Sequence, residues 1–339
     1  MKPFKSRPLG RTSLSLTALG FGGSCVGNLY GPVSEENAMG AIGTAYEAGG
    51  RYFDTAPLYG NGLGEHRMGH ALRDRPRGDF VLSTKVGRLL DPLPPGTARV
   101  AADHHRLPFR VRYDYSYDGV MRSMEHSLQR LGMNRVDVVL IHDIDAHNQG
   151  GGQSQRFKEA MGGAYPALER LRDSGAVAAI GVGVNDWQVC AACLESADFD
   201  CFLLAGRYTL LEHEALQTFL PACARRGVGV IVGAPYNSGV LARGAVEGAT
   251  YFDGPPPSTV IEKVGRMERT CAAHGVSLAA AALRFPLGHP AVASVLPGVR
   301  SAADVRRTID LFDETIPDDL WLQLKSEGLI HAEAPIPVN

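Results

Sequence analysis

The 339-residue sequence lacks the features of several specialised protein classes. No apolar run approaches the roughly 20 residues of a membrane span, and residues 1–8 are positively charged without a following apolar segment, so we expect no secretory signal. The 34 basic and 36 acidic residues give a net charge of -2, which offers no support for nucleic acid or an anionic membrane surface as the main partner. By default we expect a cytoplasmic protein.

Cysteine is scarce, and its distribution does not indicate a disulfide framework. The six cysteines stand in apolar segments at positions 25, 190, 193, 201, 223 and 271, as buried free thiols usually do. Cys190 and Cys193 have the spacing of a redox or metal pair, but they lie in a predicted helix and no second pair follows. We interpret them as core residues.

The glycine fingerprint of a doubly wound nucleotide-binding fold, the competing architecture, is also missing. Gly20-Phe-Gly22-Gly23 follows an early strand but lacks the third glycine and the following helix. Gly181-Val-Gly183 lies in mid-chain and lacks the third glycine as well.

What the sequence does contain is an alternation of strand-like and helix-like segments, which is typical of parallel β/α construction. Eight strands are predicted near residues 18–22, 51–54, 80–85, 136–142, 176–183, 200–205, 228–233 and 292–296. A helix is predicted from Ser34 to a stop at Gly49–Gly50, and further helices near 64–74, 118–131, 157–174, 186–197, 212–226, 258–274 and 301–313. Eight such repeats close a (β/α)8 TIM barrel.

No linker divides the chain, so residues 1–339 are interpreted as a single domain. Three additions to the barrel are expected. Residues 6–18 predict an N-terminal β-hairpin. Residues 88–117 predict a long loop after strand 3, which would overhang the active face as a substrate lid. Residues 317–339 predict a last helix and an extended tail.

Three of the predicted strands end on an ionisable residue, and a fourth such residue follows in a turn. Asp54, Lys85 and His142 close the runs near 51–54, 80–85 and 136–142, and Tyr59 lies in the turn after the first of them. In a parallel barrel the strand ends share the face where chemistry is done. Taken singly, each residue also has a structural interpretation, such as a helix cap, packing or a solvated charge.

Together the four side chains form a device for proton transfer. A free tyrosine has a pKa near 10, and a nearby ammonium, here Lys85, favours phenolate and would lower the pKa of Tyr59. Asp54 would hold Lys85 protonated, and His142 would donate to an oxygen beside Tyr59. No side chain carries hydride, so a nicotinamide must do so.

A metal site is the rival interpretation. His142, Asp143, Asp145 and His147 could ligate zinc in a barrel hydrolase. An H-x-H pair on the first strand is absent, however, and Lys85 and Tyr59 would then have no purpose, so we expect no metal.

Over nearly its full length the sequence resembles the aldo-keto reductase superfamily. The matching stretches are Leu9–Ser13, Leu19–Gly23, Tyr52–Gly60 with Gly64–Glu65, Thr84–Lys85, Ser127–Gly132, Asp137–His142 and Leu296–Gly298. The resemblance implies that Tyr59 is the acid/base, that Lys85 and Asp54 tune it, and that His142 orients the substrate oxygen. It implies an NAD(P)-dependent oxidoreductase, although some relatives are non-enzymatic channel-associated subunits.

Four segments carry a closer similarity to the bacterial sugar 1-dehydrogenases that act on L-fucose and related D-threo-aldoses. They are Gly27–Tyr30, Tyr113–Gly119, Gly183–Asn185 and Ala205–Leu211. This similarity implies oxidation of the anomeric carbon of an aldose to a lactone. The pyridoxal 4-dehydrogenases are similar too, so pyridoxal oxidation or general aldehyde or ketone reduction stays an alternative. The sequence indicates neither the sugar, nor the direction, nor the oligomeric state.

The resemblance also implies which residues bind the cofactor. They are Gly22, Gly23, Asp54, Asn185, Tyr236, Asn237, Ser238, Gly298, Arg300 and Asp304. The sequence departs from the family pattern where the nicotinamide amide is held. Gly183-Val184 stands in place of Ser-Asn after the fifth strand, and Ala205 in place of a Gln in the sixth.

Asp304 favours NAD over NADP. It falls where NADP-using relatives commonly have Arg, and a carboxylate there would repel a 2′-phosphate and accept from ribose hydroxyls. Arg300 argues for NADP, because it could pair with that phosphate. Compensation of the helix dipole is the alternative role of Asp304.

The substrate is expected to contact Tyr59 and His142, together with Tyr30, Tyr113 and Tyr115. The aromatic residues at 109, 113, 115 and 117 either stack on a sugar face or only fasten the long loop to the barrel.

Overall fold

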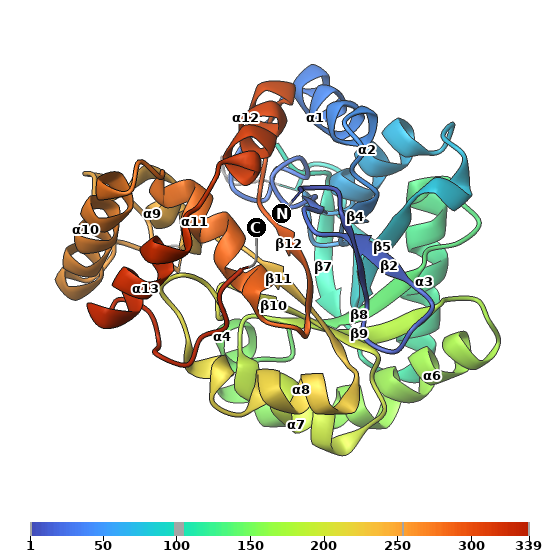
Figure 1. Cartoon of the computed structure of the whole chain (residues 1–339). Helices are drawn as coiled ribbons and strands as arrows, with labels where there is room; N and C mark the ends of the chain where they lie inside the picture. Colours follow the sequence, from blue (N-terminus) through green and yellow to red (C-terminus); the bar gives the residue numbers. More distant parts are fainter. Residues whose placement is uncertain (1, 98–104, 253, 338–339) are drawn as a thin grey trace.

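The computed structural model describes residues 2–97, 105–252 and 254–337. Eight parallel strands form one sheet in the order β12-β11-β10-β9-β8-β5-β4-β3 (Figure 1). Parallel bridges from Leu19 to Val295 and from Gly22 to Gly298 join the first strand to the last. The strands are β3 (Phe21–Gly22), β4 (Tyr52–Asp54), β5 (Val81–Val86), β8 (Val138–His142), β9 (Ala179–Val184), β10 (Cys201–Ala205), β11 (Gly229–Gly233) and β12 (Val292–Leu296). The predicted TIM barrel is confirmed.

Helices form the outer layer around the strands (Figure 1). They are α1 (Glu35–Glu47), α2 (Leu63–Leu72), α3 (Tyr117–Leu131), α4 (Ala146–Gln149), α5 (Gln153–Glu159), α6 (Tyr165–Asp173), α7 (Trp187–Ser196), α8 (Phe219–Arg226), α9 (Val240–Arg243), α10 (Ser258–Ala273), α11 (Leu278–Arg284), α12 (Ala302–Asp313) and α13 (Asp318–Ser326). Several begin at a side-chain cap, such as Ser34, whose hydroxyl accepts from the backbone of Asn37. No helix within the described ranges is both long and apolar enough to cross a membrane.

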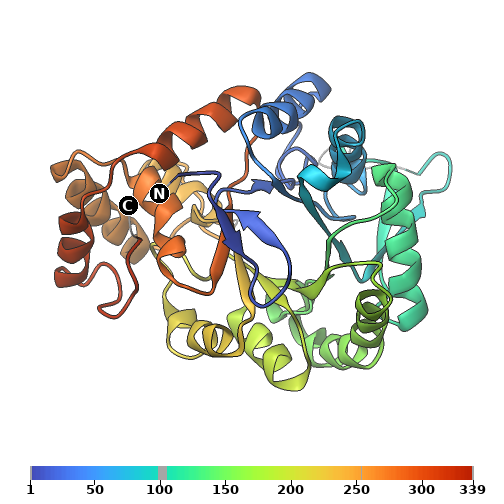
Figure 2. The same cartoon turned by 45° about the vertical axis from the view of Figure 1, so that its right-hand side comes forward.

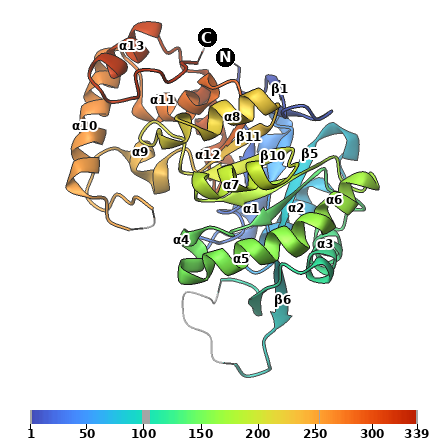
Figure 3. The ribbon, with the colours of Figure 1, turned by 90° about the horizontal axis from the view of Figure 1, so that it is seen from below.

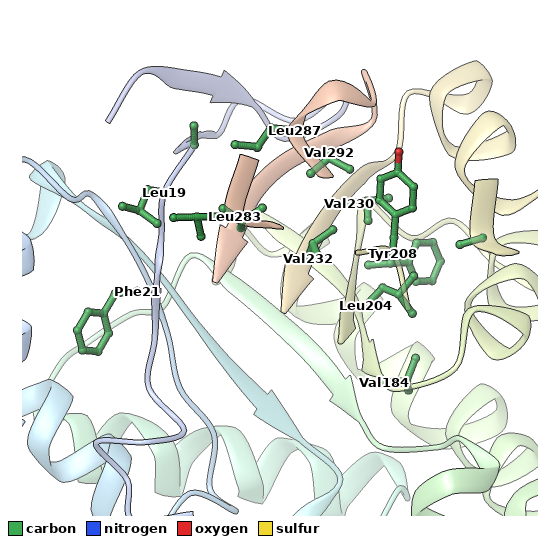
Figure 4. Packing of buried hydrophobic residues seen from close by; sticks show 14 of the residues in the cluster. Leu19, Phe21, Val184, Leu204, Tyr208, Val230, Val232, Leu283, Leu287 and Val292 are labelled. Atoms are coloured by element: carbon green, nitrogen blue, oxygen red, sulfur yellow. The ribbon is translucent and has the colours of Figure 1, made fainter. Parts of the chain in front are cut away.

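Strand side chains alternate between two apolar layers, as the pleat requires. In β8, Val138 and Leu140 belong to the cluster inside the barrel, whereas Val139 and Ile141 belong to the cluster under the helices. Part of the outer cluster is drawn in Figure 4, where side chains of β11 and β12 lie near the labelled Leu283 and Leu287. The inward-facing side chains therefore form a core of their own inside the barrel, separate from the core under the helices.

The N-terminal hairpin closes one mouth of the barrel, as the sequence predicts. Strands β1 (Ser6–Pro8) and β2 (Ser15–Thr17) pair antiparallel, and Leu9 and Leu16 join the interior cluster. The backbone N–H of Arg11 donates to the carbonyl of Gly227, just before β11 begins. The hairpin therefore covers the amino ends of the strands (Figure 2) and leaves the opposite mouth for the site.

The described parts of the segment after the third barrel strand contain two strands where the sequence predicts only a loop. Strands β6 (Arg88–Pro92) and β7 (Phe109–Tyr113) form an antiparallel ribbon that projects from the barrel (Figure 3). The loop interpretation was wrong at both ends, because Phe109, Val111 and Tyr113 alternate with arginines in the two-residue period of a strand. Residues 98–104 of the expected lid lie outside the described residues.

Two helix predictions also need correction. Helix α11, a fully buried Leu-Ala-Ala-Ala-Ala-Leu-Arg segment, is not predicted from the sequence, because a helix that is apolar on nearly all sides shows no periodic pattern. The helix expected over 212–226 begins only at Phe219, after a single 3-10 turn at Glu214–Leu216.

Candidate active site

Three of the four predicted catalytic residues occupy the topmost inward-facing positions of neighbouring strands. Along β8 the inward positions are Val138, Leu140 and then His142. By the same two-residue period, Asp54 follows Tyr52 in β4, and Lys85 lies four residues beyond Val81 in β5. The period of the strand thus brings residues far apart in the sequence to one end of the barrel.

Lys85 is the centre of the hydrogen-bond network. It is only 1 % exposed, and its Nζ lies 2.6 Å from Asp54 Oδ2, 2.9 Å from the carbonyl of Thr55 and 3.0 Å from the hydroxyl of Tyr59. The Ser83 hydroxyl donates to the other oxygen of Asp54 at 2.7 Å. A buried ammonium needs such pairing, and here three acceptors supply it.

Tyr59 comes from the turn after β4, and its ring is partly exposed. Burial of the hydroxyl, followed by the negative charges of Asp54 and Asp143, raises the pKa of Tyr59 well above its ordinary value. The Lys85 ammonium donates to the same hydroxyl, but burial outweighs it, and the net direction is opposite to the lowering that the sequence alone predicts. In this structure Tyr59 is therefore a protonated acid at neutral pH.

His142 lies across from Tyr59, with the ring centroids 6.1 Å apart and the planes 86° apart. The ring is buried, and its Nδ1 is 2.8 Å from Nη1 of Arg88. Burial, followed by the charges of Arg88 and Lys85, lowers the pKa of His142 well below its ordinary value. The imidazole is therefore neutral.

Arg88 and Asp143 complete the surroundings of His142, a role that the sequence does not predict for either residue. Arg88 Nη2 lies 2.6 Å from Asp143 Oδ2. The sequence does place Arg88 just beyond the end of β5, after the turn residue Gly87, where a side chain can reach the active face. Arg88 is nevertheless assigned to the expected loop over residues 88–117. Gly87 has φ +98°, and a Cβ there would lie 2.2 Å from the ring of Tyr115.

The donors of the rival metal site have other partners. Asp143 is paired with Arg88, and Asp145 accepts from the backbone amides of Asn148 and Asn185. No group of three or more side chains with metal-ligand geometry occurs in the part of the chain that the structure describes.

The glycines predicted to bind cofactor lie where β3 and β12 meet. Gly22 is bridged to Gly298, and the N–H of Gly23 donates to the carbonyl of Asp54 at 2.8 Å. A Cβ on Gly23 would lie 2.5 Å from that carbonyl, and one on Gly298 would lie 2.7 Å from the sulfur of Cys25. These glycines allow backbone to approach closely beside Asp54.

The loop after β11 has an unusual backbone. Ala234, Asn237 and Ser238 all have positive φ, a conformation that non-glycine residues adopt at a cost. The Asn237 side chain is buried and donates to the carbonyl of Gly206 at 3.0 Å. The Tyr236 hydroxyl is buried and has no hydrogen-bond partner among the described residues. Runs of such backbone form concave sites that suit anions.

Arg300 and Asp304 lie at the start of α12. Asp304 Oδ2 accepts from the backbone N–H of Arg300 at 3.0 Å, and the Ser301 hydroxyl accepts from the N–H of Asp304. Asp304 thus has the helix-start role that the sequence analysis names as the alternative to ribose binding. Arg300 is exposed, and its guanidinium donates to the carbonyl of Tyr30 at 3.2 Å.

Asn185 follows β9 and is partly buried. Its N–H donates to Asp145 Oδ2 at 2.9 Å, and its carbonyl accepts from Nε of Arg207 at 2.8 Å. Beside it, Gly183 leaves space next to the Lys85 side chain, since a Cβ there would be at an ordinary 3.4 Å contact.

The three additional tyrosines predicted to contact substrate occupy different environments. Tyr115 is buried, and its hydroxyl donates to the carbonyl of His142 at 2.7 Å, which favours the interpretation that it fastens the loop. The Tyr113 hydroxyl accepts from Arg88 at 3.2 Å. Tyr30 is 55 % exposed, and its backbone carbonyl accepts from Arg300, which lies just before α12.

A barrel whose open mouth holds a coupled tyrosine, lysine and aspartate beside a neutral histidine defines a class of barrel oxidoreductases. Comparison with known sequences agrees. A model of the Aldo/keto reductase family matches residues 18–327, and the chain belongs to that family. It is an NAD(P)-dependent oxidoreductase.

Two relatives show how far the similarity extends. Pyridoxal 4-dehydrogenase of Microbacterium luteolum is 42% identical over 97% of this chain and 99% of its own length. D-threo-aldose 1-dehydrogenase of a Pseudomonas species is 37% identical over 94% of this chain and 95% of its own. Among solved structures, an aldo-keto reductase from Bacillus halodurans in its holo form superposes with a TM-score of 0.74 at 24% identity, covering 98% of both chains. That likeness concerns the fold.

Proposed function

We propose that this protein oxidises the hemiacetal carbon of a cyclic aldose to a lactone with NAD. The observation that carries the proposal is the position of Lys85 Nζ, within hydrogen-bond distance of both Tyr59 and Asp54, with the His142 ring facing Tyr59. The 37% identity to the D-threo-aldose 1-dehydrogenase supports an aldose of that type, such as L-fucose, as substrate.

The residues at this mouth of the barrel suit a nicotinamide dinucleotide. The loop after β11, with positive φ at Ala234, Asn237 and Ser238, and the first turn of α12 would present backbone N–H groups to the phosphates. Two further donors are the hydroxyl of Tyr236, which has no hydrogen-bond partner among the described residues, and the exposed guanidinium of Arg300. Gly22, Gly23 and Gly298 leave room beside Asp54. Asn185 follows directly after Gly183-Val184, the position at which the family binds the amide of the nicotinamide.

The bound nicotinamide would accept the hydride from the reacting carbon. The chain's own residues would handle the proton. Tyr59 would take the proton of the hemiacetal hydroxyl as the carbonyl of the lactone forms, and His142 would hold that oxygen by a hydrogen bond. Lys85 would stabilise the phenolate of Tyr59 by charge and hydrogen bond, and Asp54 would keep Lys85 oriented.

We propose NAD as the preferred cofactor, with NADP as the weaker one. Asp304 supports this choice, because its carboxylate is held at the start of α12 by the N–H of Arg300. A 2′-phosphate near this carboxylate would meet a like charge, whereas ribose hydroxyls could donate to it. Arg300 is occupied in part by the carbonyl of Tyr30.

Pyridoxal is the second candidate substrate, favoured by the 42% identity to the pyridoxal 4-dehydrogenase. Pyridoxal carries a hydroxymethyl group next to its aldehyde and closes to a cyclic hemiacetal, as an aldose does. Both candidates therefore offer the same reacting group, a C–H carbon bearing a hemiacetal hydroxyl.

The test is a panel of aldoses, including L-fucose and its epimers, together with pyridoxal, each with NAD and with NADP. Formation of the reduced cofactor is followed by absorbance, and the product by its lactone mass. We expect turnover of an L-fucose-type aldose with NAD. Turnover of pyridoxal alone would move the assignment to the second candidate, and no turnover of any hemiacetal would reject both.

A further inference from the structure

Arg88 is a buried charge next to the site for which the proposed chemistry gives no role. It is the first residue of β6 and only 3 % exposed. Its two terminal nitrogens reach different partners: Nη1 lies 2.8 Å from His142 Nδ1, and Nη2 lies 2.6 Å from Asp143 Oδ2.

The hydrogen-bonding capacity of arginine decides the state of the imidazole. A guanidinium has donors and no acceptor, so the ring nitrogen that faces it must be an acceptor without hydrogen. The imidazole is neutral for the reasons given above. Its single hydrogen therefore has to be on the other nitrogen, Nε2.

We propose that Arg88 is a positioning residue that holds His142 as the tautomer with hydrogen on Nε2, ready to donate to the reacting oxygen. This inference rests on the proposed function, in which His142 holds that oxygen. The nearest carboxylate oxygen, Asp143 Oδ2, is 3.5 Å from Nε2. That distance is too long for an ordinary hydrogen bond, so the Nε2 hydrogen is not consumed by Asp143.

Arg88 is itself fixed from several sides. The Asp143 carboxylate balances its charge, Nη2 donates to the Tyr113 hydroxyl at 3.2 Å, and its carbonyl accepts from the Ser123 hydroxyl at 3.1 Å. The turn at Gly87 aims it inward from the end of β5. Because β6 and β7 are paired, the ribbon carries Arg88 and Tyr113 as opposite partners in register.

Four charged or titratable groups surround His142, and they predict what happens when Arg88 is removed. Arg88 and Lys85 oppose a charge on the ring, Asp143 favours one, and the Tyr59 phenol is neutral at neutral pH. Without Arg88, Asp143 becomes an unpaired buried carboxylate beside the ring. A proton on His142 would then be favoured, and the imidazolium would turn its Nε2 hydrogen to Asp143.

The first measurement is the tautomer itself. Full-length protein with ¹⁵N-labelled histidine, without substrate, is examined by long-range proton–nitrogen NMR, and the His142 signals are identified by their loss in His142→Gln. We expect an unprotonated Nδ1, a protonated Nε2 and no titration between about pH 6 and 8. Hydrogen on Nδ1, or titration near the ordinary value, would overturn the proposal.

The second measurement separates the hydrogen bond from the charge. Arg88→Met removes both, and Arg88→Gln keeps an N–H donor for Nδ1 without the charge. We expect Arg88→Met to lose about 10²-fold in kcat/KM, to lose more at low pH, and to show a titrating His142. Arg88→Gln should keep the tautomer and recover part of the activity. Arg112→Met, on the exposed side of β7, is the matched control and should behave as wild type.

The outcomes distinguish this inference from the proposed function. The NMR spectra need no turnover, so they remain decisive even if no hemiacetal is oxidised. An active enzyme whose Arg88→Met variant keeps the wild-type tautomer and pH profile would reject the role of Arg88 alone. If Arg88→Met does not fold, the wild-type spectra and Arg88→Gln still give the answer.

Discussion

At the scale of single residues, the site depends on how three acceptors share one buried ammonium. Lys85 Nζ is held by Asp54, by the Thr55 carbonyl and by Tyr59 within 2.6 to 3.0 Å. This arrangement fixes the ammonium beside the phenol, and the Tyr59 ring stays partly exposed. In the proposed mechanism, proton transfer is therefore assigned to a single atom, the oxygen of Tyr59.

Removing that oxygen should stop turnover without emptying the site. We expect Tyr59→Phe to lower kcat by about 10²–10⁴-fold, the contribution of general acid–base catalysis, while NAD binding measured by fluorescence titration is retained. Tyr165→Phe removes a phenol that is bonded to Glu169 on the outer helix α6 and serves as control. A wild-type kcat for Tyr59→Phe would show that another group moves the proton.

The raised pKa of Tyr59 predicts how the two directions depend on pH. Oxidation needs the deprotonated phenol, so below that pKa the oxidation rate should rise about tenfold per pH unit. Reduction needs the protonated phenol and should be flat over the same range. Steady-state kcat/KM for both directions checks this, and an oxidation rate that is flat from neutral pH upward would contradict it.

Lys85→Met should move the pH at which oxidation reaches its plateau to a higher value. Loss of the neighbouring cation disfavours phenolate, so the pKa of Tyr59 rises further. The residual rate is measured across pH beside Lys325→Met, which changes a lysine on α13. A profile that coincides with that of Lys325→Met would exclude the tuning role of Lys85.

At the scale of elements, the strand ends could be predicted from sequence because they are short apolar runs that close on polar residues. The ribbon β6–β7 and the buried helix α11 were missed. The first was hidden by prolines, and the second has no polar face to produce a period. The contact between Arg88 and His142 was not predictable, because it depends on the direction of the turn at Gly87.

Gly87 should therefore tolerate no side chain. Gly87→Ala places a Cβ at φ +98° and 2.2 Å from the Tyr115 ring, and we expect a loss of roughly 1–3 kcal/mol in the free energy of unfolding. Urea denaturation gives the value. Gly43→Ala lies in α1 with open space around it and should stabilise the protein by about 0.5–1 kcal/mol. Equal stability of the two variants would argue against strain at Gly87.

At the scale of the whole molecule, the two mouths of the barrel differ: one is closed by the hairpin, and the other holds the candidate active site. The hairpin closes the amino ends of the strands, and the loops at the carboxyl ends gather the site and the expected cofactor-binding residues. Sequence patterns located the barrel and the three strand-end residues. The cofactor contacts could be placed only by resemblance, since loop conformations such as the positive φ of Ala234 have no pattern in the sequence.

The cofactor preference tests the assignment of the α12 end of this mouth. Asp304→Asn keeps an acceptor for the Arg300 N–H but removes the charge, and we expect the ratio of kcat/KM for NAD over NADP to fall roughly five- to tenfold, equivalent to about 1 kcal/mol. Asp310→Asn, further along α12, is the control. An unchanged ratio, or NADP preference in the wild type, would remove the argument from Asp304.

The central claim is that one substrate oxygen is shared by Tyr59 and His142 next to a nicotinamide ring. A crystal structure of the protein with NAD and the hemiacetal found in the substrate panel measures this directly. We expect this oxygen to lie within hydrogen-bond distance of both the Tyr59 hydroxyl and His142 Nε2, with the hemiacetal carbon against the nicotinamide. A substrate oxygen bound away from Tyr59, or a nicotinamide outside this mouth of the barrel, would contradict it.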